Sequence, residues 1–132
     1  MLGLPSLGEF DRHSSLRIWL ARDPADMRCG FDRLAQLAQS ITGQDPLSGH
    51  LFLFRSRGGD RLKVLLWERD GFWILYKRLE AGTFRFPRIG DGQMSVQIKP
   101  SELAMLLEGI DLSSVRRRPR YEAKKIEASA GK

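Results

Sequence analysis

Residues 61–87 carry the clearest pattern of hydrophobic and polar positions in the chain. Three short runs alternate there in the manner of β-strands, at residues 61–67, 72–78 and 83–86. Asp70-Gly71 separates the first two runs and Ala81-Gly82 separates the last two. Aspartate-glycine between apolar runs is a strong hairpin signal, because glycine accepts the positive φ that a tight primed turn requires. The segment therefore predicts an antiparallel meander.

The first of these runs divides its side chains between two sides of the strand. Leu62 and Val64 point to one side, whereas Arg61 and Lys63 point to the other. One face of the predicted sheet is therefore suited to a hydrophobic core and the other to binding an anion. An ordinary solvated face is the alternative, since many antiparallel sheets have one wet face that carries arginine and lysine.

Two helices are predicted outside this meander. The first starts at Pro24, because Asp23 can accept hydrogen bonds from the first-turn amides, and it ends at Gly43. Its apolar stripe has helical spacing and consists of Met27, Phe31, Leu34, Ala38 and Ile41. The second helix covers residues 100–108 and stops at Gly109. Its packing face consists of Leu103, Leu106, Leu107 and Ile110.

Three further strands, at residues 16–20, 51–55 and 95–98, complete the pattern. This order of elements predicts a single-domain α+β fold. We expect a mainly antiparallel sheet of about five or six strands, with both helices packed on one face. The length of 132 residues supports one core, which we place at residues 15–112. Residues 1–14 are predicted to be a flexible leader and residues 113–132 a disordered basic tail.

Charge is unevenly distributed along the chain, whose net charge is +6. Residues 50–88 contain nine cationic side chains and four acidic ones, and residues 116–132 contain seven and two. Segregated charge produces a field that attracts polyanions. The candidate nucleic-acid-binding residues are therefore Arg55, Arg57, Arg61, Lys63, Lys77, Arg78, Arg85, Arg116, Arg117, Arg118 and Arg120. A role in solubility alone is the alternative for the tail.

The sequence contains no catalytic or metal-binding constellation, so we expect neither an enzyme nor a cofactor. His50 has no second histidine or paired cysteine at metal-ligand spacing and is interpreted as a turn or strand-edge residue. Apolar runs are far shorter than the roughly 20 residues that span a bilayer. No secretory signal is recognisable at the N-terminus. Together with the single cysteine, Cys29, these features favour a cytoplasmic protein.

Short motifs in a fixed order give the chain a family resemblance. They are Asp26-Met27-Arg28, Gly30-Phe31-Asp32, Asp45-Pro46, Ser48-Gly49-His50-Leu51-Phe52, Asp60-Arg61-Leu62-Lys63, Gly71-Phe72, Tyr76-Lys77-Arg78-Leu79-Glu80, Gly82, Phe84, Phe86-Pro87 and residues 103–111 (LAMLLEGID). Over about residues 16–112 the chain resembles the accessory TnpB family of the insertion-sequence-66 group of bacterial transposable elements. The resemblance implies a small protein encoded beside a DDE-type transposase and needed for efficient transposition.

Two positions depart from the family pattern. Cys29 stands where the family usually has lysine or arginine, which removes one cation from a motif that could touch DNA. Lys99 stands before Pro100 where the family usually has a threonine or serine helix cap. The last helix should therefore be poorly capped at its start, at a cost of about 1 kcal/mol.

Two functions fit these features. The first is a non-enzymatic accessory factor of transposition that binds DNA, at the element ends or non-specifically, through a basic sheet face and the C-terminal arm. The second is an adaptor that binds the DDE-type transposase of the same element without contacting DNA. Four aromatic residues are compatible with either, because aromatic side chains concentrate at protein interfaces and also stack on unpaired bases: Trp19, Trp67, Trp73 and Tyr76. Sequence alone does not indicate the oligomeric state.

Overall fold

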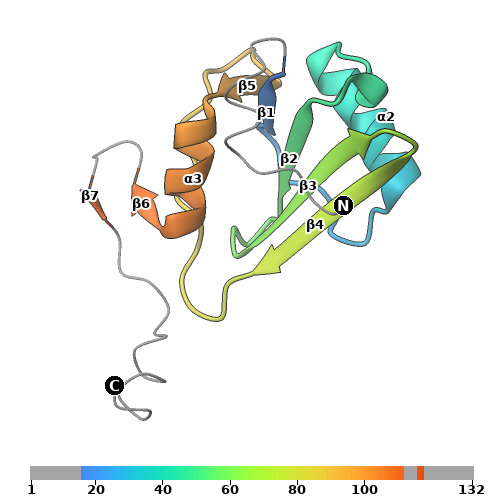
Figure 1. The fold of residues 1–132 in the computed structure, drawn as a ribbon. Helices are drawn as coiled ribbons and strands as arrows, with labels where there is room; N and C mark the ends of the chain where they lie inside the picture. Colours follow the sequence, from blue (N-terminus) through green and yellow to red (C-terminus); the bar gives the residue numbers. More distant parts are fainter. Residues whose placement is uncertain (1–15, 112–115, 118–132) are drawn as a thin grey trace.

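The computed structural model describes residues 16–111 and 116–117, and Figure 1 shows how their elements are arranged. In chain order the elements are β1 (Ile18–Ala21), α2 (Phe31–Thr42), the 3-10 helix η1 (Pro46–Ser48), β2 (Leu51–Arg55), β3 (Arg61–Glu68), β4 (Gly71–Arg78), β5 (Ser95–Ile98), α3 (Pro100–Glu108), β6 (Ile110–Asp111) and β7 (Arg116–Arg117). None of the helices among these residues is long and apolar enough to cross a membrane.

The main sheet has five strands in the order β4-β3-β2-β1-β5. Strands β1 and β2 are parallel, and α2 with η1 forms the long connection that a parallel pair requires. The other three neighbouring pairs are antiparallel. The expected α+β class and mainly antiparallel sheet are confirmed.

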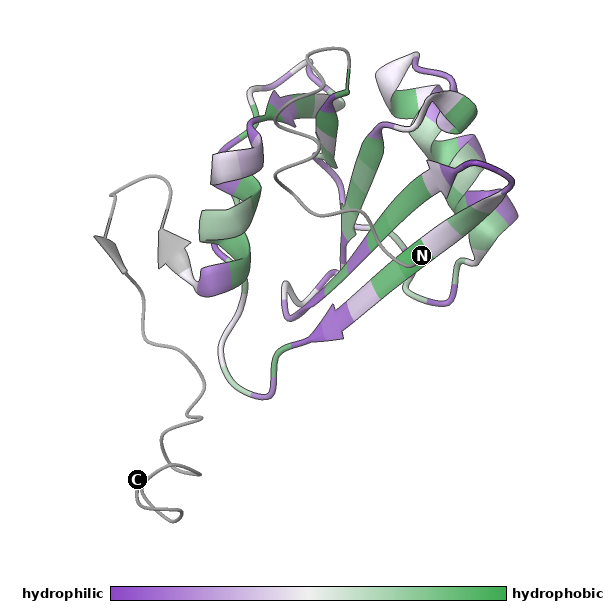
Figure 2. Cartoon of the chain, viewed as in Figure 1, coloured by the Kyte–Doolittle hydropathy of each residue, from purple (hydrophilic) through white to green (hydrophobic). Residues whose placement is uncertain are grey.

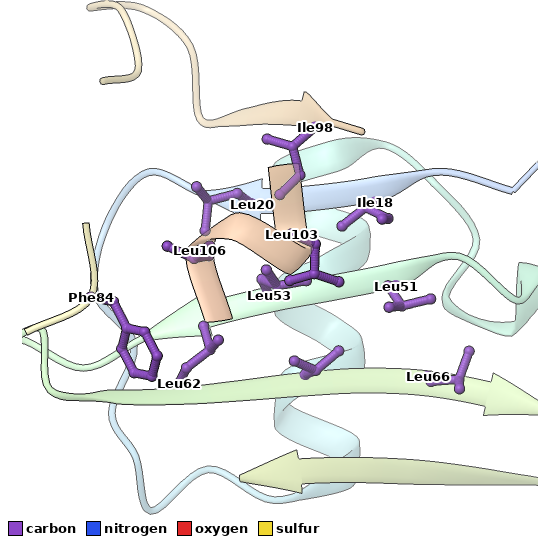
Figure 3. Packing of buried hydrophobic residues seen from close by; sticks show 11 residues of the cluster. Ile18, Leu20, Leu51, Leu53, Leu62, Leu66, Phe84, Ile98, Leu103 and Leu106 are labelled. Atoms are coloured by element: carbon purple, nitrogen blue, oxygen red, sulfur yellow. The ribbon is translucent and has the colours of Figure 1, made fainter. Parts of the chain in front are cut away.

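The two helices cover opposite faces of this sheet, so the expectation that both pack on one face was wrong. Strand β2 shows the division, because Leu53 belongs to the cluster under α3 whereas Phe52 and Phe54 belong to the cluster under α2. All three side chains are at most 1 % exposed. Figure 3 shows the first cluster with α3 in front of the strands and α2 behind them. In Figure 2 the hydrophobic colour accordingly runs along the middle of the sheet.

Helix α2 begins at Phe31, seven residues later than predicted. Two hydrogen bonds, one long-range and one local, hold the preceding segment in another conformation: the backbone N–H of Ala25 donates to the Arg55 carbonyl oxygen (2.9 Å), and that of Arg28 donates to the Asp26 carboxylate (2.9 Å). The hydrogen bond from the Arg28 guanidinium is the main reason that the pKa of Asp26 falls to about 2. Leu34 and Ala38 are buried as predicted, whereas Phe31 is 50 % exposed, so the predicted stripe was wrong at this position. Gly43 ends the helix with φ 71°.

The β3–β4 hairpin forms at the predicted place with a different turn. Arg69, not Gly71, adopts positive φ (58°), and the Asp70 N–H donates to the Glu68 carbonyl oxygen at 2.6 Å. This bond across two residues is the γ-turn pattern with a positive central φ. The third predicted strand, residues 83–86, is not a strand. Phe84 instead inserts its side chain into the cluster under α3 with 4 % exposed.

Helix α3 is capped better than the sequence suggested. Lys99 supplies no side-chain cap, as expected, but its backbone N–H donates to the Glu102 carboxylate at 2.7 Å. This bond satisfies a group that would otherwise lack a partner at the helix start. Beyond Gly109, β6 pairs with β7 in a separate two-stranded sheet. Arg116 and Arg117 therefore lie in a short strand inside the tail that was expected to be disordered, and the rest of that tail lies outside the described residues.

Candidate nucleic-acid interface

Cationic side chains gather at one end of the main sheet. Arg55 ends β2, Arg61 begins β3 and Arg78 ends β4, and antiparallel pairing brings these three strand ends together. Arg57 lies in the connection between β2 and β3, and Lys77 precedes Arg78. Arg85 follows Phe84, and the backbone N–H of Phe84 donates to the carbonyl oxygen of Gly59 (2.9 Å). Gly59 lies in the β2–β3 connection that also contains Arg57. We call this set the sheet-end cluster: Arg55, Arg57, Arg61, Lys77, Arg78 and Arg85.

The cluster shares an end of the sheet but not a face, so the predicted basic sheet face was wrong. Arg61 pairs directly with Arg78, and both point to the α2 side. Lys77 pairs with Leu62, which belongs to the core under α3, and therefore points to the α3 side together with Arg55. Successive strand residues point to opposite faces, so neighbouring cations cannot form one flat patch. They can surround a strand end.

Lys63 does not belong to this surface. Only 8 % of it is exposed, and its ammonium donates to the carbonyl oxygens of Met27 (2.7 Å) and Cys29 (2.8 Å). The same nitrogen lies 4.8 Å from the centre of the Tyr76 ring. Lys63 therefore attaches the segment before α2 to the sheet, and the prediction that it binds nucleic acid is corrected.

Arg55 is partly buried and held by its neighbours. Its Nε donates to the Arg22 carbonyl oxygen (3.1 Å), and its guanidinium carbon lies 5.4 Å from the centre of the Phe86 ring. Beside it lies an open hollow of about 320 Å³, which Arg22 and Arg88 also line. Arg22 pairs with Asp23 at 3.1 Å, which offsets part of this positive charge.

The remaining members of the cluster differ in how much of their charge is neutralised. Arg61 lies 3.9 Å from the Asp60 carboxylate and donates to the Tyr76 hydroxyl (3.3 Å), and Arg78 pairs with Glu80 (3.1 Å). The other three side chains are exposed and have no ion-pair partner within residues 16–111: Arg57, Lys77 and Arg85. The six cations of the cluster thus have only two carboxylate partners within residues 16–111, those of Asp60 and Glu80. An excess of positive charge remains at this end of the sheet, where the arrow tip of β4 is hydrophilic in Figure 2.

The other candidates lie in the C-terminal part of the chain. Arg116 and Arg117 form β7, whereas Arg118 and Arg120 lie outside the described residues. Two aromatic contacts of the sheet-end cluster were not foreseen, the hydroxyl of Tyr76 on Arg61 and the ring of Phe86 on Arg55. The sequence holds no local signal for them, because each joins residues from different elements.

Aromatic exposure is concentrated on β4. Trp73 is 41 % exposed and Tyr76 is 51 % exposed, whereas Trp19 and Trp67 are only partly accessible. Leu75 between the exposed aromatic residues is 39 % exposed. The exposed aromatic side chains that would favour a protein partner therefore lie on β4. The last residues of β4 belong to the sheet-end cluster.

His50 has the structural role that was predicted for it. It immediately precedes β2, and its Nδ1 accepts a hydrogen bond from the Arg17 backbone N–H at 3.0 Å. Burial lowers its pKa, and the positive charge of Arg17 adds to the effect. Across the described part of the chain, no group of three or more histidine, cysteine, aspartate or glutamate residues could hold a metal ion.

Comparison with known proteins yields one family and two relatives. The family model described as "IS66 Orf2 like protein" matches residues 16–117. The uncharacterized protein y4hO of Sinorhizobium fredii (strain NBRC 101917 / NGR234) is 41 % identical over 97 residues, which cover 74 % of this chain and 83 % of y4hO. The uncharacterized protein y4jC of the same strain is 38 % identical over 104 residues, or 79 % and 87 % of the two chains. No solved structure matches.

Proposed function

Because this chain belongs to the IS66 Orf2-like family of transposition accessory proteins, we propose that it is a non-enzymatic factor that binds DNA. The proposed contacts are the sheet-end cluster and the cationic residues that follow β7. The observation that carries the proposal is the charge excess at the sheet end, where Arg57, Lys77 and Arg85 are exposed without an acidic partner within residues 16–111.

Phosphate contacts are the interaction that this geometry supports. Arginine presents a planar fork of N–H donors that matches a phosphate group, and lysine contributes a point charge. The cluster surrounds strand ends and places no helix or ribbon of side chains where base edges could be read. Binding should therefore depend on the DNA backbone and show little preference among sequences.

A triple substitution tests the role of the sheet end. We expect Arg57→Gln, Lys77→Gln and Arg85→Gln together to weaken binding to a short duplex at least about tenfold, because released counterions supply most of such affinity. Each substitution should alter the free energy of unfolding by no more than about 0.5 kcal/mol, since all three residues are exposed. Fluorescence anisotropy with labelled duplex and urea unfolding measure the two effects.

A matched variant controls for net charge. Arg17, Arg69 and Lys99 are also exposed but lie at the other end of the strands, next to Ile18, Glu68 and Ile98. Replacing these three by glutamine removes the same charge and should weaken binding much less. Equal losses in the two triple variants would mean that overall charge, and not the sheet end, determines binding.

The adaptor function remains a second candidate because β4 exposes Trp73, Leu75 and Tyr76. Exposed aromatic side chains of this kind are enriched at energetically important interface positions. The purified parent chain and a Trp73→Ala variant distinguish the two functions. If the chain shows no measurable affinity for duplex DNA but binds the purified transposase of its own element, and Trp73→Ala weakens that complex, the adaptor replaces the DNA-binding proposal.

A further inference from the structure

In the part of the chain that the structure describes, the central part of the outer strand β4 lacks the usual protection of a sheet edge. Within the described residues it pairs only with β3. Natural edge strands are commonly short, interrupted by proline or a bulge, or guarded by a charged residue in their middle. Strand β4 has eight residues, and its central run from Phe72 to Tyr76 contains neither proline nor charge. The opposite edge, β5, follows the usual rule with only four residues and an exposed Gln97.

From this edge we propose that β4 pairs antiparallel with β4 of a second copy of this chain, with the two-fold axis at Ile74. Directly opposed residues of an antiparallel pair share a face of the sheet. In this register Ile74 faces its own equivalent, Trp73 faces Leu75 of the other copy, and Phe72 faces Tyr76. Every large apolar side chain of the edge then meets an apolar or aromatic partner.

The charges at the two ends of β4 also fit a two-fold arrangement. The hairpin tip carries Glu68, Arg69 and Asp70, with a net charge of −1, and the other end carries Lys77, Arg78 and Glu80, with a net charge of +1. Antiparallel pairing places each tip beside the oppositely charged end of the other copy. Asp70 then lies opposite Arg78. A parallel arrangement would instead juxtapose like charges.

The exposure of the edge supports a second copy as its occupant. Trp73, Leu75 and Tyr76 are each 39–51 % exposed; Trp73 and Leu75 point to the α3 side of the sheet, and Tyr76 points to the α2 side. A partner that covered one face would leave the other side chains in water, whereas an added strand shields both faces. Because the contact is limited to one strand and its flanking turns, the interface should be small, below about 1,200 Å², and the association correspondingly weak. Pairing through this edge does not depend on DNA binding.

Sedimentation equilibrium of the full chain tests the proposal. We expect a dimer at about 100 μM protein, as for a micromolar dissociation constant. Leu75→Lys should weaken dimerisation at least about tenfold, because lysine in the middle of an edge strand prevents strand addition. The control Met94→Lys also introduces lysine in place of an exposed apolar residue, here one that is 48 % exposed beside β5, and this variant should remain dimeric. Unchanged melting temperatures would show that both variants fold.

The charge pairing and the register have separate tests. Asp70→Arg alone should weaken the dimer, and adding Arg78→Asp in the same chain should restore it. In a Cys29→Ser background, Ile74→Cys should form an intermolecular disulfide on mild oxidation, since opposed Cα atoms lie about 4.5–5.5 Å apart. Leu75→Cys should not, because each Leu75 faces Trp73 of the other copy.

Three results would overturn the proposal. The first is a parent chain that stays monomeric at this concentration. The second is a dimer that Leu75→Lys and Asp70→Arg leave unchanged. The third is a dimer that appears only after removal of residues 1–15, which would assign the cover of β4 to the N-terminal residues of the same chain.

Discussion

At the scale of single residues, Lys63 illustrates how a charged group can serve as structure. Its ammonium is the partner of two carbonyl oxygens from the segment before α2. We expect Lys63→Gln to lower the free energy of unfolding by about 1–3 kcal/mol, because a shorter neutral side chain leaves these carbonyls unpaired. Urea unfolding measures the change, and Lys77→Gln at an exposed position is the control. A loss below about 0.5 kcal/mol would show that water replaces the ammonium without cost.

His50 should make stability depend on pH near neutrality. Its ordinary pKa is 6.5, and burial lowers it in the folded chain. The unfolded chain therefore binds more protons just below pH 6.5, so stability should fall as pH decreases from about 6.5 toward the folded pKa. His50→Asn keeps an acceptor for the Arg17 N–H and cannot titrate. Thermal melts between pH 7.5 and 5 should be flatter for this variant, and an identical slope in both proteins would contradict the assignment.

At the scale of elements, the two ends of α2 predict opposite effects of substituting glycine. Gly30 caps the start with φ −100°, and no atom lies within 4 Å of the place that a Cβ would occupy there. Gly30→Asp should stabilise by a few tenths to about 1 kcal/mol, since it supplies a cap and a negative charge at the helix start. Gly43 has φ 71°, so Gly43→Ala should destabilise by roughly 1 kcal/mol. Urea unfolding of both variants checks the signs.

Most elements could be predicted because their signals are local. Strands β2 and β5 and helix α3 occupy the expected residues, and β3 and β4 differ by one residue each. The start of α2 could not be predicted, because the carbonyls that would continue the helix toward the N-terminus bind Lys63, more than 30 residues away. Helical periodicity also reveals an apolar stripe but not the sheet face that it covers. The continuous apolar run from Leu51 to Phe54 was the available signal that both faces of the sheet are covered.

The candidate site was predicted in its residue types but not in its geometry. The count of charges along the chain included six cations that lie at one end of the sheet, because antiparallel connections return to the same end. It also included Lys63, which is buried, and Arg69, which lies at the opposite end. Parity within β3 suggested that Arg61 and Lys63 act together, and both do point to the same side. Helix α2 and its leading segment cover Lys63 and leave Arg61 at the rim. Which residues on one face of a strand remain exposed depends on tertiary packing, and no local sequence pattern indicates it.

At the scale of the whole molecule, two basic regions are candidates to contact one duplex, and the salt dependence of binding can separate them. Each phosphate contact on duplex DNA adds about 0.9 to the slope of log K against log salt. We expect the sheet-end triple variant to lower this slope, by at most about 2.7.

Truncation after Arg117, which removes five cationic residues, should lower the slope independently, and combining both changes should lower it by the sum if one duplex spans both regions. The control triple variant should leave the slope nearly unchanged. If truncation alone abolishes the salt dependence, the sheet end does not contact phosphate, and DNA binding resides in the residues after β7.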